Sequence, residues 1–108
     1  MKVQVGAIVQ ARMNSSRLPR KVLMPILGIP MLGILISRIK KVHSINKIII
    51  ATTENSIDDD IVNFLKKEIN VIIYRGDELN VLKRFYKAAK INGLSHILRV
   101  TGDNPFFD

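Results

Sequence analysis

The stretch "VQVGAIVQ" (residues 3–10) is followed without interruption by "ARMNSSRLPRK" (residues 11–21). The first segment is mostly apolar and rich in valine, which is typical of a buried β-strand. The second segment contains no acid and four permanently cationic side chains: Arg12, Arg17, Arg20 and Lys21. The sequence therefore predicts a buried strand that leads directly into a strongly basic loop.

The composition limits the class of protein. The chain has 108 residues, enough for one domain with one modest core, and its 47% hydrophobic and 24% charged content is ordinary for a soluble globular protein. No apolar run reaches the length of a membrane span, so we expect no membrane partner. The sequence has no cysteine, which excludes disulfides and thiolate sites and is compatible with the cytoplasm.

The positive charge is concentrated in the first half of the chain. The formal net charge is +8, and no acid precedes Glu54. Such a one-sided distribution suits an anionic partner. On charge alone, nucleic acid, a nucleotide triphosphate and an anionic sugar all remain candidates.

Strand-like and helix-like segments alternate along the chain. The expected strands are residues 3–10, 47–53, 71–75 and 96–101, and the expected helices are residues 30–41, 56–69 and 78–91. This alternation predicts an α/β fold with a parallel sheet and helices on both faces. If the first three strands run in order across the sheet and the fourth lies on the other side of the first, the loops after the first and fourth strands are neighbours. Ligands of such sheets bind beyond the carboxyl ends of the strands.

Local signals suggest how the helices begin. Ser56 and Asp59 resemble a capping box, and the carboxylates of residues 58–60 suit the positive end of a helix, so we interpret them as stabilising the helix rather than binding metal. Asp77 is the expected cap of the helix over residues 78–91. We expect four of that helix's side chains to face the sheet: Leu82, Phe85, Tyr86 and Ala89.

The basic loop matches neither GxxxxGK[ST] nor GxGxxG. It nevertheless offers hydroxyls from Ser15 and Ser16 beside several cations, and guanidinium groups bind phosphate oxygens in pairs. The alternative is a solvated surface loop, which charge alone does not exclude. Asp103, in "TGDNP" after the fourth expected strand, could hold Mg²⁺ opposite such a loop or simply form a turn.

Four segments, in order over essentially the whole chain, carry a family resemblance. They are "AIVQARMNSSRLPRKVLMPILGIPML", "IIIATTENSIDDDIV", "YRGDELNVLKRFYKAA" and "RVTGDNPFFD". Together they resemble the SpsF-type cytidylyltransferases of spore coat polysaccharide biosynthesis, which are related to the CMP-sialic acid and CMP-KDO synthetases.

The resemblance implies a fold and a reaction. The fold is a three-layer α/β/α nucleotide-diphospho-sugar transferase (GT-A-like) fold, of which residues 1–108 would be the N-terminal, nucleotide-binding part. The reaction transfers CMP from CTP to a sugar, releases pyrophosphate and uses Mg²⁺. By position, the nucleotide-binding residues would be Ala11, Arg12, Ser15, Ser16, Arg17 and Lys21. Lys21 and Arg17 would also be catalytic, and Asp103 would be the metal ligand.

The sequence departs from the family pattern in several places. Asn14 and Arg20 stand where glycine is usual, and Asn80 and Lys83 stand where aspartate is usual. Family domains are roughly twice as long, which is within the ordinary domain range. We therefore expect an incomplete domain whose fourth strand is an open edge that could support a homodimer.

Two other functions remain open. One is a non-catalytic nucleotide-binding or assembly domain, because the sugar-binding half is not in this sequence. The other is a nucleic-acid-binding module, which we disfavour because aromatic residues make up only 6% of the chain and no RNA- or DNA-binding signature is present.

Overall fold

A computed structural model describes residues 3–14 and 21–101. Its central sheet has the order β5 (Val71–Gly76), β4 (Lys47–Thr53), β1 (Val5–Gln10) and β6 (His96–Thr101), and every neighbouring pair is parallel. The α/β class is confirmed, and the fourth expected strand lies beside the first.

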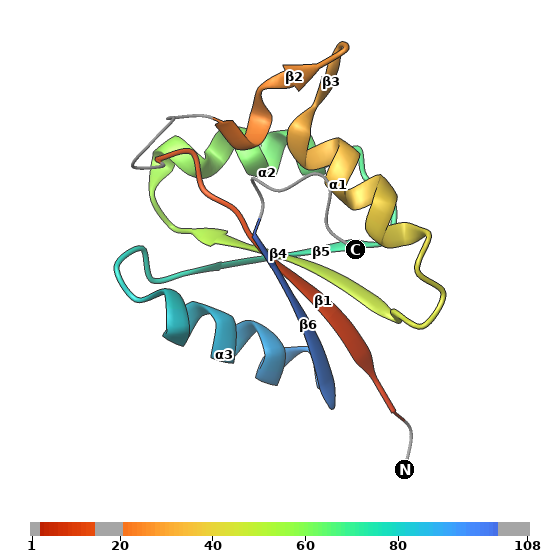
Figure 1. Ribbon diagram of the computed structural model, residues 1–108. Coiled ribbons are helices and arrows are strands. Elements are labelled where there is room, and N and C mark those ends of the chain that lie inside the picture. The colour runs from red at the N-terminus through yellow and green to blue at the C-terminus, as the bar shows by residue number, and fades with distance from the viewer. Residues whose placement is uncertain (1–2, 15–20, 102–108) are drawn as a thin grey trace.

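Helices cover both faces of this sheet (Figure 1). On one face lie α1 (Met31–Lys40) and α2 (Asp59–Leu65), the latter preceded by the 3₁₀ turn η2 (Ser56–Asp58). On the other face lies α3 (Val81–Ile91). Three layers result, as expected from the alternation of strands and helices.

Burial on both faces explains the composition of the central strands. Within β4, every residue from Ile48 to Thr53 is buried, so a continuous β-branched run is suitable where alternation would place polar groups in the core. Side chains of β1 divide between the two layers: Ala7 and Val9 pack in the cluster under α1, and Ile8 packs in the cluster under α3. The two clusters together form the core.

A small hairpin separates the basic segment from α1. After the 3₁₀ turn η1 (Lys21–Leu23), strands β2 (Pro25–Ile26) and β3 (Ile29–Pro30) pair antiparallel. The two residues between these strands, Leu27 and Gly28, have φ values of 52° and 85°. Two consecutive positive φ values are characteristic of the tight turn that matches the twist of a hairpin. This hairpin was not predicted from the pattern of the sequence.

Two predicted helix boundaries were wrong. Helix α2 ends at Leu65 rather than at residue 69, and Ile69 lies outside it and is 73% exposed. At the start of η2 the cap is Asn55, whose side chain accepts a hydrogen bond from the Ile57 amide, rather than Ser56. Asn55 and Ser56 are both suitable cap residues by type, so the sequence pattern did not distinguish them. The hydrogen bond from the Ile57 amide identifies Asn55 as the cap.

The cap of α3 was also mispredicted. Asn80 is the N-cap residue, and its Oδ1 accepts from the Lys83 amide at 2.9 Å. Asp77 instead closes a local turn by accepting from the Leu79 amide. The predicted end of the helix is confirmed, since Asn92 is the C-cap and Gly93 adopts a φ of 65°.

None of the helices formed by the described residues is long and apolar enough to cross a membrane.

We predict that Asn80→Ala lowers the free energy of unfolding by about 1 kcal/mol, because it removes the side-chain acceptor at the start of α3. Asp77→Ala is the matched variant and should cost less, since its hydrogen bond closes an exposed turn outside the helix. Urea denaturation of both variants measures the difference. A larger loss for Asp77→Ala would contradict the assignment of the cap.

Candidate functional site

The carboxyl ends of β1, β4 and β6 meet at one edge of the sheet. Gln10, the last residue of β1, lies opposite Ala51 of β4 and Thr101 of β6. The amide of Ala11 extends the pairing by one residue, donating to the Ala51 carbonyl at 3.0 Å. The basic segment therefore begins at the edge where ligands of parallel sheets bind.

A buried carboxylate holds the backbone of the basic segment two residues further on. The Met13 amide donates to Oδ1 of Asp58 at 2.7 Å, and both residues are buried, with exposed fractions of 2% and 1%. The hydroxyl of Thr53 donates to Oδ2 of the same carboxylate. Arg12, between the two anchored amides of Ala11 and Met13, is exposed.

This finding corrects the interpretation of Asp58, whereas Asp59 and Asp60 lie in the first turn of α2 as expected. Asp58 is the N-cap residue of α2, but its side chain makes no capping hydrogen bond. The carboxylate turns instead toward β4 and the basic segment. Its neighbour Asp59 pairs with Arg75 at 2.8 Å. Helix stabilisation therefore does not explain why an aspartate occupies position 58.

Arg75 fixes the turn that carries Asp58. Its Nε donates to the carbonyl of Thr53 at 2.7 Å, and Nη2 donates to the carbonyl of Asn55 at 2.9 Å. Together with the ion pair to Asp59, these bonds connect the end of β5 to the turn after β4. The acceptor for the Met13 amide is thus itself held in place.

A second arginine is buried at the same edge. Arg84, on α3, is 2% exposed; its Nε donates to Oε1 of Gln10 at 3.0 Å and its Nη1 to the carbonyl of Asp77 at 2.7 Å. Gly76 allows this close packing, because a Cβ there would lie 3.1 Å from Cγ of Arg84 and 2.8 Å from Cε2 of Tyr74. Arg84 therefore joins the end of β1 to the loop after β5.

Charged groups of both signs act on the buried guanidinium of Arg84. Burial lowers the pKa of Arg84, and the positive charge of Arg12 lowers that pKa further. Asp58, Asp77 and Glu78 act in the opposite direction and raise it. Two guanidinium groups are thus close enough to repel each other. The carboxylates of Asp58, Asp77 and Glu78 offset this repulsion and help to keep the buried guanidinium charged.

The structure describes three of the predicted site residues. Ala11 and Arg12 lie at the carboxyl end of β1, as expected, and Lys21 is half-buried at the start of η1, where its carbonyl accepts from the Met24 amide. The other four predicted residues lie outside the described part of the chain: Ser15, Ser16, Arg17 and Asp103. Asp103 follows, by two residues in sequence, Thr101 of β6, which lies opposite Gln10.

The described residues do not form a metal site by themselves. Within residues 3–14 and 21–101, no group of three or more His, Cys, Asp or Glu side chains could hold an ion. Both histidines, His43 and His96, are exposed, and neither belongs to such a group. The role of Asp103 as a metal ligand remains a prediction.

Sequence reasoning missed Asp58, Thr53 and Arg84. A buried threonine or aspartate at a strand–helix junction has no distinctive pattern, because the partner amide of Met13 is 45 residues away in sequence. Arg84 offered one signal: it is a cation two residues after Leu82 and directly before Phe85 on a helix that must cover the sheet.

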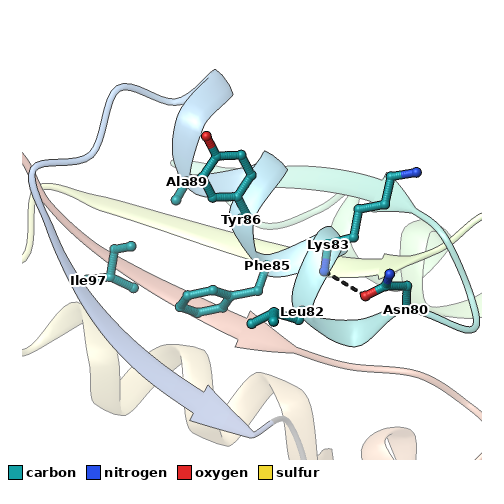
Figure 2. Close-up of a pocket in the computed structure, with 7 residues that line it drawn as sticks. All are labelled: Asn80, Leu82, Lys83, Phe85, Tyr86, Ala89 and Ile97. Atoms are coloured by element: carbon teal, nitrogen blue, oxygen red, sulfur yellow. Dashed lines mark hydrogen bonds between the residues drawn. The ribbon is translucent and has the colours of Figure 1, made fainter.

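A separate apolar groove lies between α3 and β6. It has a volume of about 560 Å³ and is lined by Asn80, Leu82, Lys83, Phe85, Tyr86, Ala89 and Ile97. Figure 2 shows Phe85 and Ile97 within it and the ammonium of Lys83 pointing away. The prediction that Leu82 and Tyr86 face the sheet was wrong, because these side chains are 73% and 60% exposed. A mostly apolar lining, from which the Lys83 ammonium points away, does not suit a triphosphate.

Comparison with known proteins identifies the family. Residues 6–108 match the family model described as cytidylyltransferase, and the chain therefore belongs to the cytidylyltransferase family. It is 42% identical over 103 residues to an uncharacterised protein of Methanocaldococcus jannaschii. It is 40% identical over 105 residues to the spore coat polysaccharide biosynthesis protein SpsF of Bacillus subtilis. These alignments cover 95% and 94% of this chain but 42% and 43% of the two relatives.

Solved structures agree on the fold. A cytidylyltransferase from Leptospira borgpetersenii superposes with a TM-score of 0.92 at 36% identity, over 99% of this chain and 44% of that one. CMP:2-keto-3-deoxy-manno-octonic acid synthetase complexed with CTP superposes with a TM-score of 0.72 at 24% identity, a likeness of fold alone. The chain thus spans less than half the length of the relatives it matches.

We predict that Arg12→Gln weakens the binding of inorganic tripolyphosphate by about tenfold, in the range of a charge-assisted hydrogen bond. Because Arg12 is exposed, the unfolding midpoint should not fall. Lys41→Gln is the control: Lys41 follows the end of α1 and is also exposed. Calorimetric titration at two salt concentrations measures the affinities. Equal losses in the two variants would indicate a general effect of net charge and contradict a localised site.

Proposed function

We propose that this chain binds the triphosphate of CTP at the carboxyl edge of β1 and belongs to an enzyme that transfers CMP to a sugar. The carrying observation is the exposed Arg12, held between the anchored amides of Ala11 and Met13 at the carboxyl end of β1. Family membership supplies the nucleotide class. SpsF, by its name, acts in spore coat polysaccharide biosynthesis, and we extend that kind of role, precursor synthesis for a surface glycan in the cytoplasm, to this protein.

The basic segment would perform the binding. The backbone near Ala11 would lie beside the base, and Arg12, Ser15, Ser16, Arg17 and Lys21 would contact the phosphates. Arginine can bind two phosphate oxygens at once, whereas lysine acts as a compact point charge. Several cations at close spacing suit a ligand that carries several negative charges over a short length.

The proposed reaction is an in-line displacement at phosphorus. A sugar hydroxyl attacks the α-phosphorus of CTP and gives up its proton to water, the bond from that phosphorus to the bridging oxygen breaks, and pyrophosphate leaves. Positioning and charge stabilisation supply most of the catalysis in phosphoryl chemistry, so no covalent enzyme intermediate is required. Lys21 and Arg17 would stabilise the negative charge that grows on the phosphates.

The proposal includes Mg²⁺, for which Asp103 would be the protein ligand. A carboxylate is a typical magnesium ligand, and such sites combine one or two carboxylates with phosphates of the substrate. Bound there, the ion would neutralise phosphate charge during the reaction. The support is the register of β6 with β1, which brings Thr101 beside Gln10 at the edge from which the basic segment starts.

A second candidate function is binding of a nucleotide without turnover. Its support is that the described part of the site, the exposed Arg12 on an anchored backbone, accounts for the binding of an anion but not for chemistry on it. In that case the chain would bind CTP as one part of an assembly, such as a homodimer, without turning it over.

Pyrophosphate release separates the two candidates. The chain is incubated with CTP, Mg²⁺ and a series of anionic sugars, and CTP binding is measured in parallel. Sugar-dependent release supports the transferase. CTP binding without release under all conditions supports the second candidate, and no binding of CTP contradicts both.

In protein that turns over CTP, we predict that Lys21→Ala and Asp103→Ala each abolish pyrophosphate release, because they remove phosphate neutralisation and metal binding. Lys41→Ala is the control and should retain activity. Circular dichroism spectra of all three variants should match that of the unmodified protein. Near-normal turnover in Lys21→Ala or Asp103→Ala would refute the role assigned to that residue.

A further inference from the structure

We propose that Asp58 is a positioning residue for the nucleotide, which it does not touch: its buried carboxylate fixes the backbone of the basic segment at Met13. The inference rests on the proposed function, in which this segment binds the triphosphate. Its structural basis is the 2.7 Å hydrogen bond from the Met13 amide to Oδ1 of Asp58.

The anchoring is specific to one turn of the chain. The amide of Ala11 is held by the Ala51 carbonyl, and the amide of Met13 is held by Asp58. Arg12, placed between the two, has its Cα fixed from both sides while its side chain remains exposed. Because the backbone around Arg12 is already ordered, the segment loses less conformational entropy when a ligand binds.

The acceptor is rigid because its second oxygen is also engaged. The Thr53 hydroxyl donates to Oδ2 of Asp58, and Thr53 is fully buried at the end of β4. The carbonyl of Thr53 accepts from Arg75, and the turn that follows is held by the same guanidinium. The orientation of the carboxylate is therefore set by two neighbouring strands before any ligand arrives.

Charge alone would give Asp58 the opposite role. The negative charge of Asp58 lies close to the basic segment and would repel a bound anion. The same charge stabilises the charged form of Arg84 and so raises the pKa of Arg84. If Asp58 acted only through its charge, removing that charge would strengthen the binding of a polyanion. If it acts by holding Met13, removing the acceptor weakens binding even though a repulsive charge disappears.

Two substitutions separate these roles. Asp58→Asn removes the charge but keeps an oxygen for the Met13 amide and places an NH₂ group against the Thr53 hydroxyl. Asp58→Ala removes both the charge and the acceptor, leaving the buried Met13 amide without a partner. Glu68→Gln is the control, since Glu68 lies beyond the end of α2 and pairs with Lys40 at 3.7 Å.

The test measures CTP affinity by calorimetry in all three variants and in the unmodified chain. We expect Asp58→Ala to bind CTP about tenfold more weakly, the scale of one lost buried hydrogen bond. Asp58→Asn and Glu68→Gln should stay within about twofold of the unmodified chain, or bind more tightly in the case of Asp58→Asn. Equal affinity in Asp58→Ala and Asp58→Asn overturns the inference.

Hydrogen exchange of individual amides provides a readout that does not depend on CTP. In Asp58→Ala the Met13 amide should exchange faster, while the Ala11 amide, bonded to a backbone carbonyl, should not change. If Asp58→Ala does not fold, Thr53→Val replaces it, because it frees the carboxylate to reorient. The expected result is then faster exchange at Met13 with weaker CTP binding, and unchanged values overturn the inference. An unmodified chain that folds but does not bind CTP instead removes the proposed function.

Discussion

The parallel pairing of β1 with β4 on one side and β6 on the other is the constraint on which the site depends. It aligns Gln10 with Ala51 and with Thr101, so β1 and β6 end together and β4 extends two residues further. The chain reaches the two neighbours of β1 by different connections, and strand order reverses at β1. A crevice for ligands is expected at such a reversal, beyond the carboxyl ends of the strands. The basic segment leaves β1 at this point.

The site combines exposed cations with a buried framework. Arg84 connects the end of β1 to the loop after β5, and Asp58 connects the basic segment to the end of β4. Buried charged groups are tolerated here because each is hydrogen-bonded to partners on other elements. The framework is complete before a ligand binds, so binding energy need not be spent on ordering the start of the segment.

The sequence predicted the architecture better than the contacts. Runs such as residues 47–53 are long and β-branched, so the strands and their alternation with helices were evident, and the family resemblance is confirmed by the match over residues 6–108. The sequence did not predict which of several nearby polar residues caps a helix. In α3, for example, the cap is Asn80 rather than Asp77. The partnership of Asp58 with Met13 arises only when distant segments pack together. The exposure of Leu82 and Tyr86 beside the edge strand β6 could not be read from helical periodicity, which reports an apolar stripe but not what covers it.

The most direct test of the central claim is an NMR titration of the ¹⁵N-labelled chain with CTP and Mg²⁺, following every assigned amide. The account predicts that the largest shift changes include Arg12 and Met13 at the end of β1 and Thr101 at the end of β6, and that they saturate together with one dissociation constant. Saturable changes centred instead on the opposite edge, around Lys41 and Lys47, with none at Arg12, would contradict it.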